Sequence, residues 1–217
     1  MNQICYLCGK KQAETRDHIF PRNLFPRPLS SNLPTVPCCQ DCNNSLSNDE
    51  EVCRTSVASG KAYETLSGHR IWDERVRPSL KQNRRGFKTL LRKLVREVKL
   101  SPMGIYAVVL EIDQNLVNRV PKKIAKGLYY LDKGEPLPDY VELLYKYAGD
   151  EPQKLIEPPF DKAIQGAKRA ELGQGVVTYW RNIIKDDPSN SMTWLLFYNV
   201  HPFLILSVNE NILASTK

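Results

Sequence analysis

Apolar residues recur at helical spacing in the middle of the chain, from Ser79 onward. On a helical wheel these positions fall within an arc of about 140°, as expected for an amphipathic helix. They are Phe87, Leu90, Leu91, Leu94, Val95 and Val98. The opposite side of the wheel carries Arg85, Lys88, Arg92, Lys93, Arg96 and Lys99. The pattern predicts a helix with a basic outer face, preceded by a short helix over 71–76 that stops at Pro78.

The C-terminal half, residues 101–217, alternates between β-type runs and helical segments. Strands are predicted over 105–112, 176–184, 193–199 and 203–208, with a turn at 200–202 between the last two. Helices are predicted over 116–131, with Pro121 in the first turn, and over 140–148. Together these elements indicate an α+β domain with an antiparallel sheet of about four strands.

The first 58 residues are organised by cysteines. Cys5-x-x-Cys8 and Cys39-x-x-Cys42 are two knuckles about thirty residues apart, which is typical of a zinc site with four thiolate ligands. Cys38 leaves a Cys38-x-x-x-Cys42 pairing open, but the usual two-residue spacing favours Cys39. A module this small buries little apolar surface, so bound zinc should supply folding free energy on the order of 10 kcal/mol.

Between the knuckles, residues 15–20 are expected to form one arm of a hairpin and the proline-rich stretch 21–37 a loop. Residues 43–59 are expected to form a helix. Asp17 and His18 lie on the hairpin arm, and Asn43 directly follows Cys42. Neighbouring residues of a strand point to opposite faces, so Asp17 and His18 serve one site only if the strand bends or ends there.

These side chains suit phosphodiester hydrolysis. Asp and Asn supply hard oxygen ligands for Mg²⁺ or Mn²⁺, and a divalent cation stabilises charge on the leaving oxygen. A neutral imidazole takes the proton from an attacking water at neutral pH. Arg16 and Arg22 flank the pair, where they are candidates to clamp a phosphate.

The order of knuckle, Asp-His strand, loop, second knuckle and helix opening with Asn resembles the HNH endonuclease family, in its zinc-bearing, endonuclease VII-like form. The resemblance covers residues 1–58 and implies a small zinc-stapled ββα-metal, treble-clef-like module. It also implies that His18 is the general base, that Asp17 and Asn43 hold the catalytic cation, and that Asn32 orders the loop. Asn23 is an alternative to Asn32, and Asn44 is an alternative to Asn43.

The net charge of +7 is unevenly distributed. Residues 70–99 contain eleven Lys or Arg and three Asp or Glu, whereas 1–55 are balanced at six each and 100–217 contain thirteen against fourteen. A localised basic stripe is typical of polyanion binding, so we expect contacts with the DNA phosphate backbone. The residues expected to make them include Arg85, Lys88, Arg92, Lys93 and Arg96.

Composition narrows the setting. Hydrophobic residues make up 41% and charged residues 25% of the chain, as in soluble globular proteins. No apolar run reaches the roughly 18 residues of a membrane span, and the N-terminus has no signal-peptide pattern. Since four of six cysteines have metal-ligand spacing, we expect a reducing, cytoplasmic location and no membrane partner.

The C-terminal half shows no second catalytic constellation. His69 and His201 have no ligand-spaced partners, and Trp180 and Trp194 are expected in the core, with base stacking as the alternative. This half is a candidate surface for substrate, a regulator, a protein partner or a second copy of the chain in a homodimer.

The sequence therefore predicts a zinc-bound nuclease module over 1–58, a basic amphipathic helical segment over 59–100 and an α+β domain over 101–217. The expected function is metal-dependent DNA cleavage, and resemblance to small HNH proteins suggests phage defence. The alternative is a non-catalytic, zinc-dependent nucleic-acid-binding protein, and a third interpretation has the basic face contact an acidic protein.

Overall fold

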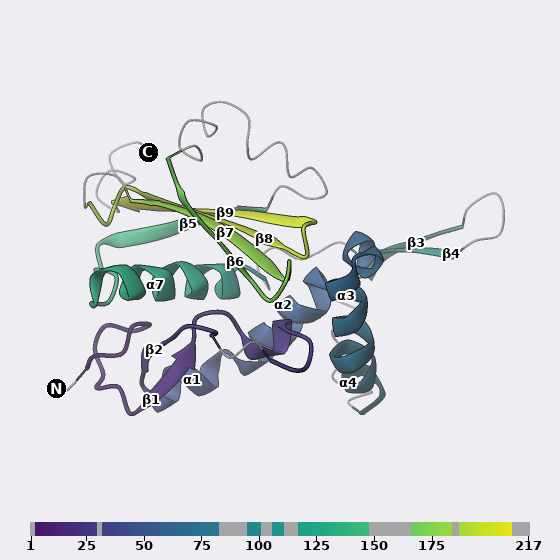
Figure 1. Cartoon of the computed structure of the whole chain (residues 1–217), viewed down its shortest axis with the longest axis horizontal. Helices are drawn as coiled ribbons and strands as arrows, with labels where there is room; N and C mark the ends of the chain where they lie inside the picture. The colour runs from purple at the N-terminus through teal and green to yellow at the C-terminus, as the bar shows by residue number, and fades with distance from the viewer. Residues whose placement is uncertain are drawn as a thin grey trace.

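The computed structural model describes residues 3–29, 32–82, 95–100, 106–110, 117–147, 166–183 and 187–209. A five-stranded antiparallel sheet, the helix α7 and the N-terminal segment form three layers, with α7 in the middle (Figure 1). Within these ranges, no helix combines the length and the apolar composition that crossing a lipid bilayer demands.

The N-terminal layer begins with an antiparallel hairpin, β1 (Thr15–His18) paired with β2 (Thr35–Cys38). The arm predicted from the sequence is present, and it ends at His18. Part of the predicted 21–37 loop is instead strand β2. A proline is compatible with this strand, because in a two-stranded sheet each strand has one edge whose backbone N–H groups need no strand partner. A single turn, η1 (Arg22–Leu24), follows β1, and two helices follow β2: α1 (Gln40–Ser45) and α2 (Ser47–Val57).

The chain then runs through η2 (Gly60–Glu64), α3 (Leu66–Ile71), the π-helical turn η3 (Trp72–Val76) and α4 (Arg77–Gln82). The prediction that Pro78 stops the helix is wrong. The helical run continues from α3 through the π-helical turn η3 into α4, and Pro78 lies within this run, directly after the irregular turn.

The predicted basic helix is wrong at its C-terminal end. Residues that it included form strand β3 (Val95–Leu100), which pairs antiparallel with β4 (Tyr106–Leu110). Valine favours strands, and Val98 pairs with Val108 of β4. The helical prediction considered residues 79–99 alone and not this pairing with a neighbouring segment. Arg96 and Lys99 therefore lie on a strand. The rest of the predicted basic face lies outside the described residues: Arg85, Lys88, Arg92 and Lys93.

The C-terminal sheet has the strand order β5-β9-β8-β7-β6. Three predicted strands are confirmed as β7 (Val177–Ile183), β8 (Ser191–Phe197) and β9 (His201–Asn209). The turn before β9 spans 198–200 rather than 200–202, because Tyr198 and Asn199 adopt positive φ.

Two strands of this sheet differ from the prediction. The expected helix over 140–148 is wrong, since these residues form β5 (Val141–Tyr147), in which buried Val141 and Leu143 alternate with exposed Glu142 and Leu144. That two-residue period fits a strand beside β9. The charged strand β6 (Lys168–Leu172) was not predicted and pairs with β7 at the edge of the sheet.

Helix α7 (Arg119–Lys133) confirms the predicted helix and its Pro121 in the first turn, and it ends at Gly134, which adopts a left-handed φ of 75°. Gly127 lets α7 approach the N-terminal layer closely, because a Cβ there would lie 2.9 Å from the side chain of Ile19. Phe20 packs on Tyr179, with ring centroids 5.3 Å apart. One buried cluster thus joins the N-terminal layer, α7 and the sheet, and it fixes the backbone next to His18.

Candidate functional site

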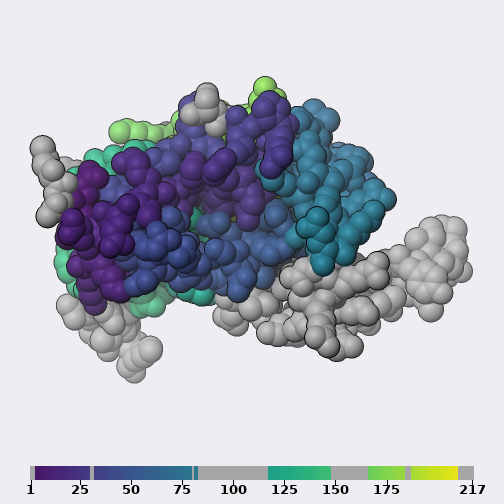
Figure 2. All heavy atoms as spheres, turned by 90° about the horizontal axis from the view of Figure 1, so that it is seen from below, coloured from purple at the N-terminus to yellow at the C-terminus, as the bar shows by residue number. Residues whose placement is uncertain are grey.

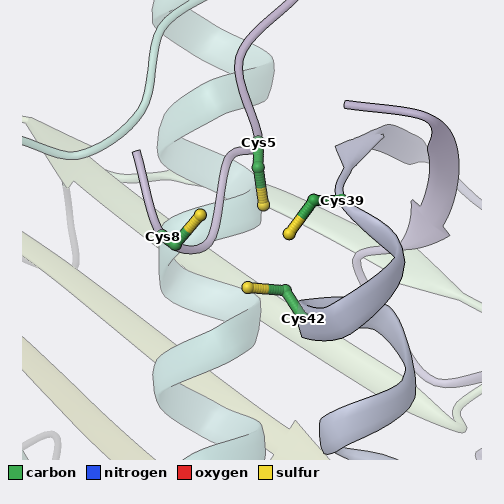
Figure 3. A group of neighbouring side chains, drawn as sticks. All are labelled: Cys5, Cys8, Cys39 and Cys42. Atoms are coloured by element: carbon green, nitrogen blue, oxygen red, sulfur yellow. The ribbon is translucent and has the colours of Figure 1, made fainter. Parts of the chain in front are cut away.

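Four cysteines converge at one end of the N-terminal layer (Figure 3). Cys5 and Cys8 come from the N-terminal loop, while Cys39 and Cys42 come from the start of α1. Their sulfur atoms all lie within 4.8 Å of one another. Among the described residues, no other group of at least three His, Cys, Asp or Glu side chains is gathered in this way.

This group can hold a metal ion such as zinc. Tetrahedral zinc with Zn–S bonds of 2.3 Å places its sulfurs about 3.8 Å apart, which the cluster can reach with small movements. Cys39, favoured from the knuckle spacing, belongs to the group, whereas Cys38 packs behind it with its Sγ 3.8 Å from that of Cys5. Burial raises the pKa of Cys5, but hydrogen bonds from backbone N–H groups lower it overall to about 7, which favours the thiolate that a metal needs.

The first knuckle is attached to the rest of the molecule through its backbone. The ammonium of Lys126 in α7 donates to the carbonyl of Leu7 at 3.1 Å, and the Tyr6 N–H donates to the carbonyl of Pro37 at 3.0 Å. The cysteine group is therefore continuous with the hairpin that carries Asp17 and His18.

Asp17 is buried, with 7% of its surface exposed, and faces α7. Its Oδ2 accepts a hydrogen bond from the Tyr6 hydroxyl at 2.7 Å and lies 2.9 Å from the ammonium of Lys123, which also donates to Oδ1 at 3.0 Å. Burial and the Asp17 charge raise the pKa of Tyr6, so its hydroxyl stays protonated and able to donate.

Lys123 itself is 2% exposed and has a second carboxylate partner, Glu50 of α2, at 2.6 Å. Burial raises the pKa of Glu50, and the charge of Lys123 opposes this shift. The network Tyr6–Asp17–Lys123–Glu50 thus joins the knuckle, β1, α7 and α2 through buried, charge-assisted hydrogen bonds.

His18, the last residue of β1, is half-buried and points away from the Asp17 side, as strand alternation requires. Burial lowers its pKa and the neighbouring charge of Arg22 lowers it further, while Asp17 opposes the shift. In the described part of the chain no hydrogen bond engages the imidazole. The ring is therefore neutral at neutral pH and able to accept a proton.

Asn43 is brought to β1 but not to Asp17 directly. Its Nδ2 donates to the hydroxyl of Thr15 at 3.1 Å, two residues before Asp17 on the same face of the strand. This leaves the Asn43 carbonyl oxygen available as a ligand. The side chain of Asn43 thus lies on the face of β1 that carries Thr15 and Asp17, and His18 is the last residue of the strand.

A divalent cation at Asp17 and Asn43 would meet one restriction. A carboxylate offers about four acceptor directions, and Tyr6 and Lys123 use three of those of Asp17, so Oδ1 keeps one. With one carboxylate and one amide, the remaining ligands would be water and phosphate oxygens, as Mg²⁺ prefers. The nearby ammonium of Lys123 competes with a cation for the same negative charge.

The other predicted site residues lie in different settings. Asn32 is exposed in the connection between the hairpin strands, and Asn44 accepts a hydrogen bond from Gln40. Arg16 donates to the hydroxyl and the carbonyl of Thr35 at 2.9 and 2.7 Å, so it braces the hairpin. Arg22 lies in η1 with an exposed side chain.

Outside the N-terminal layer, the residues that were judged structural have structural contacts. His69 pairs with Asp73, and His201 is buried beside Tyr147. Trp180 and Trp194 lie opposite each other on neighbouring strands and pack in a small apolar cluster.

Sequence reasoning missed Lys123, Tyr6, Glu50 and Thr15. Lys123 had a detectable signal, because it interrupts the apolar stripe of α7 between Val120 and Gly127, all of them buried. A lysine inside a buried stripe needs an acidic partner. Nothing in the sequence identifies that partner as Asp17, since the pair is 106 residues apart.

Comparisons with protein-family models, with curated proteins and with solved structures give no match to this chain. Its functional interpretation depends on the geometry and chemistry of its own residues.

Proposed function

We propose that the protein is a metal-dependent DNA endonuclease of the HNH type, with zinc in the four-cysteine group and His18 as general base. The observation that carries the proposal is a half-buried imidazole, without a hydrogen bond in the described part of the chain, at the end of the strand that carries Asp17 and that Asn43 contacts through Thr15. The ββα order of β1, β2 and α1 around the cysteine group supports it.

In the proposed reaction, the neutral imidazole of His18 takes a proton from water as the water oxygen attacks the phosphorus. The bond between phosphorus and the leaving oxygen breaks, and that oxygen takes a proton from solvent. A divalent cation held by Asp17 and Asn43 supplies charge stabilisation at the leaving oxygen. Tyr6 and Lys123 orient the Asp17 carboxylate from behind, as outer partners of ligating carboxylates do.

The proposed substrate is DNA, with its backbone held by the basic surplus of residues 70–99. Docking by such contacts sets affinity and position rather than sequence preference. A cytoplasmic location and a role in phage defence complete the proposal, and the C-terminal sheet is the candidate surface for a second copy or a protein partner.

One observation favours a second function, a non-catalytic, zinc-dependent nucleic-acid-binding protein. The Lys123 ammonium contacts both oxygens of Asp17 and also contacts Glu50. It therefore already supplies a positive charge at the carboxylate that the nuclease would use to bind its cation. In this alternative the ammonium takes the place of the catalytic cation permanently, and the N-terminal layer only presents basic side chains to nucleic acid.

Incubation of the purified protein with supercoiled plasmid separates the two functions. The nuclease predicts nicked or linear products with Mg²⁺ or Mn²⁺ and none without added divalent ions. The binding protein predicts retarded but intact plasmid under every condition, with retention that falls steeply as salt rises. Intact DNA with both ions would therefore exclude the nuclease.

A further inference from the structure

A cavity of about 670 Å³ opens where the loop after β1 meets η3. Arg22, Asn23, Arg27, Pro28 and Leu29 line it from the loop, and Arg75 lines it from η3. Figure 2 shows the two segments side by side, the purple N-terminal segment against the blue-teal helices. The size is that of a small-ligand or nucleotide site.

The charge of this cavity is uncompensated. Among the described residues no Asp or Glu lines it, and none forms an ion pair with Arg22, Arg27 or Arg75. The nearest acidic side chains already have partners: Glu74 pairs with Arg70, and Asp73 pairs with Arg77 and His69. Three guanidinium groups thus share one opening without an anion.

Buried polar atoms at the cavity also lack partners. The Nε of Arg75 and the Oδ1 of Asn23 are buried without a hydrogen bond. Burial lowers the pKa of Arg54; the charge of Glu51 opposes this shift, and the like charge of Arg75 adds to it. An anion in the cavity would offset this repulsion.

The walls are fixed in place. The backbone N–H of Arg27 donates to Glu74 at 2.8 Å, and the Arg70 guanidinium donates to the carbonyl of Arg27. Both ends of the Arg27 residue are therefore held on η3 and α3. Pro28 and Leu29 add an apolar side to the cavity, which suits the sugar or base next to a phosphate better than a bare anion.

We propose that this cavity binds a phosphate of the nucleic acid strand next to the one that is cleaved, with Arg22, Arg27 and Arg75 as its ligands. The assignment rests on the proposed function, since it takes nucleic acid as the substrate. Arg22 connects the cavity with the reaction, because it lies in η1, four residues after His18 at the end of β1.

The test is binding of a short fluorescein-labelled DNA duplex, measured by anisotropy without added Mg²⁺ or Mn²⁺, so that cleavage plays no part. We expect Arg27→Gln and Arg75→Gln each to reduce the slope of log affinity against log salt by about one. The double variant should bind at least about tenfold more weakly near 100 mM salt. The matched control is Lys146→Gln, at an exposed residue of β5, the edge strand opposite β6. This substitution should lower the salt slope by less than one and the affinity by less than about tenfold.

The outcomes separate the two proposals. Wild-type affinity and slope in the double variant overturn the cavity assignment alone, and absence of any duplex binding by the wild type overturns both proposals. Displacement of the duplex by an equimolar deoxynucleoside monophosphate assigns the cavity to a free nucleotide and overturns it as a strand site. If Arg75→Gln melts early, Arg27→Gln, whose side chain is exposed, decides the question.

Discussion

The ammonium of Lys123 in α7 lies 2.9 Å from the carboxylate of Asp17 in β1, and the two residues are 106 positions apart in the sequence. Both are almost fully buried, and Lys123 is shared with Glu50. This contact determines how available Asp17 is to a metal and how strongly the N-terminal layer is held on the rest of the molecule.

Replacement of Lys123 by Met should be strongly destabilising. It leaves the buried carboxylates of Asp17 and Glu50 without their cation, and breaking a buried pair on one side costs about 3–5 kcal/mol. Urea unfolding measures the change in the free energy of unfolding. Lys122→Met is the control, because Lys122 has no ion pair in the described structure. A loss below about 1 kcal/mol for Lys123→Met would show that the pair contributes little.

Replacement of Tyr6 by Phe removes one hydrogen bond to Asp17 but leaves the ion pair with Lys123 intact. Hydrogen bonds to charged groups contribute about 1.5–3 kcal/mol, so we expect a loss of that size in unfolding free energy. Tyr63→Phe, at an exposed tyrosine, should change stability by less than about 0.5 kcal/mol. Equal effects of the two variants would contradict the assigned role of Tyr6.

Close packing between Gly127 and Ile19 predicts a coupled pair of substitutions. Gly127→Ala introduces a Cβ 2.9 Å from two carbons of Ile19, and such overpacking costs about 1–3 kcal/mol. Ile19→Ala removes both of these carbons, so the double variant should lose less stability than the sum of the singles. Simple additivity in a double-mutant cycle would argue against this contact.

The ligand set of the cysteine group predicts a metal stoichiometry. We expect one zinc per chain in the wild type, in Cys38→Ser and in Cys53→Ser, and a large loss of zinc in Cys39→Ser. Elemental analysis of purified proteins measures it. Chelation of the wild type should lower its melting temperature, because the metal stabilises the folded state. Full zinc content in Cys39→Ser, with loss in Cys38→Ser, would reverse the assignment of the third ligand.

The charge of Arg22 predicts a shift in the pH dependence of cleavage. Burial lowers the pKa of His18 and Arg22 lowers it further, so the acidic limb of kcat/KM should lie below the ordinary histidine value. Arg22→Gln removes a positive charge, which favours the imidazolium, and the limb should move to higher pH. Lys146→Gln should leave the limb in place. A shift to lower pH in Arg22→Gln would contradict this interaction.

Local patterns in the sequence were sufficient to predict several elements. Cysteine spacing identified the ligand group, and the apolar stripe of α7 and the β-rich runs of β7, β8 and β9 identified their elements. Residues 95–100 and 141–147 were assigned to helices because their apolar positions also suit a helical period. Pairing with β4 and with β9 decides these cases, and it depends on residues distant in the sequence.

The site was predictable only in part for the same reason. Asp17, His18 and Asn43 were proposed as site residues from their places beside the knuckles, and their roles stay a prediction. Lys123 and Arg75 come from later helical segments, and only the packing of α7 and η3 brings them to the N-terminal layer, where Lys123 meets Asp17 and Glu50. The competition between an ammonium and a metal for Asp17 was therefore not visible in the sequence.

The most direct test of the proposed nuclease is the initial rate of Mg²⁺-dependent plasmid cleavage by His18→Ala, compared with wild type and with His69→Ala as the matched histidine control. The account predicts a rate at least about 100-fold lower for His18→Ala, with zinc content and DNA binding preserved, and a near wild-type rate for His69→Ala. Cleavage by His18→Ala at the wild-type rate would contradict the role of His18 as the base.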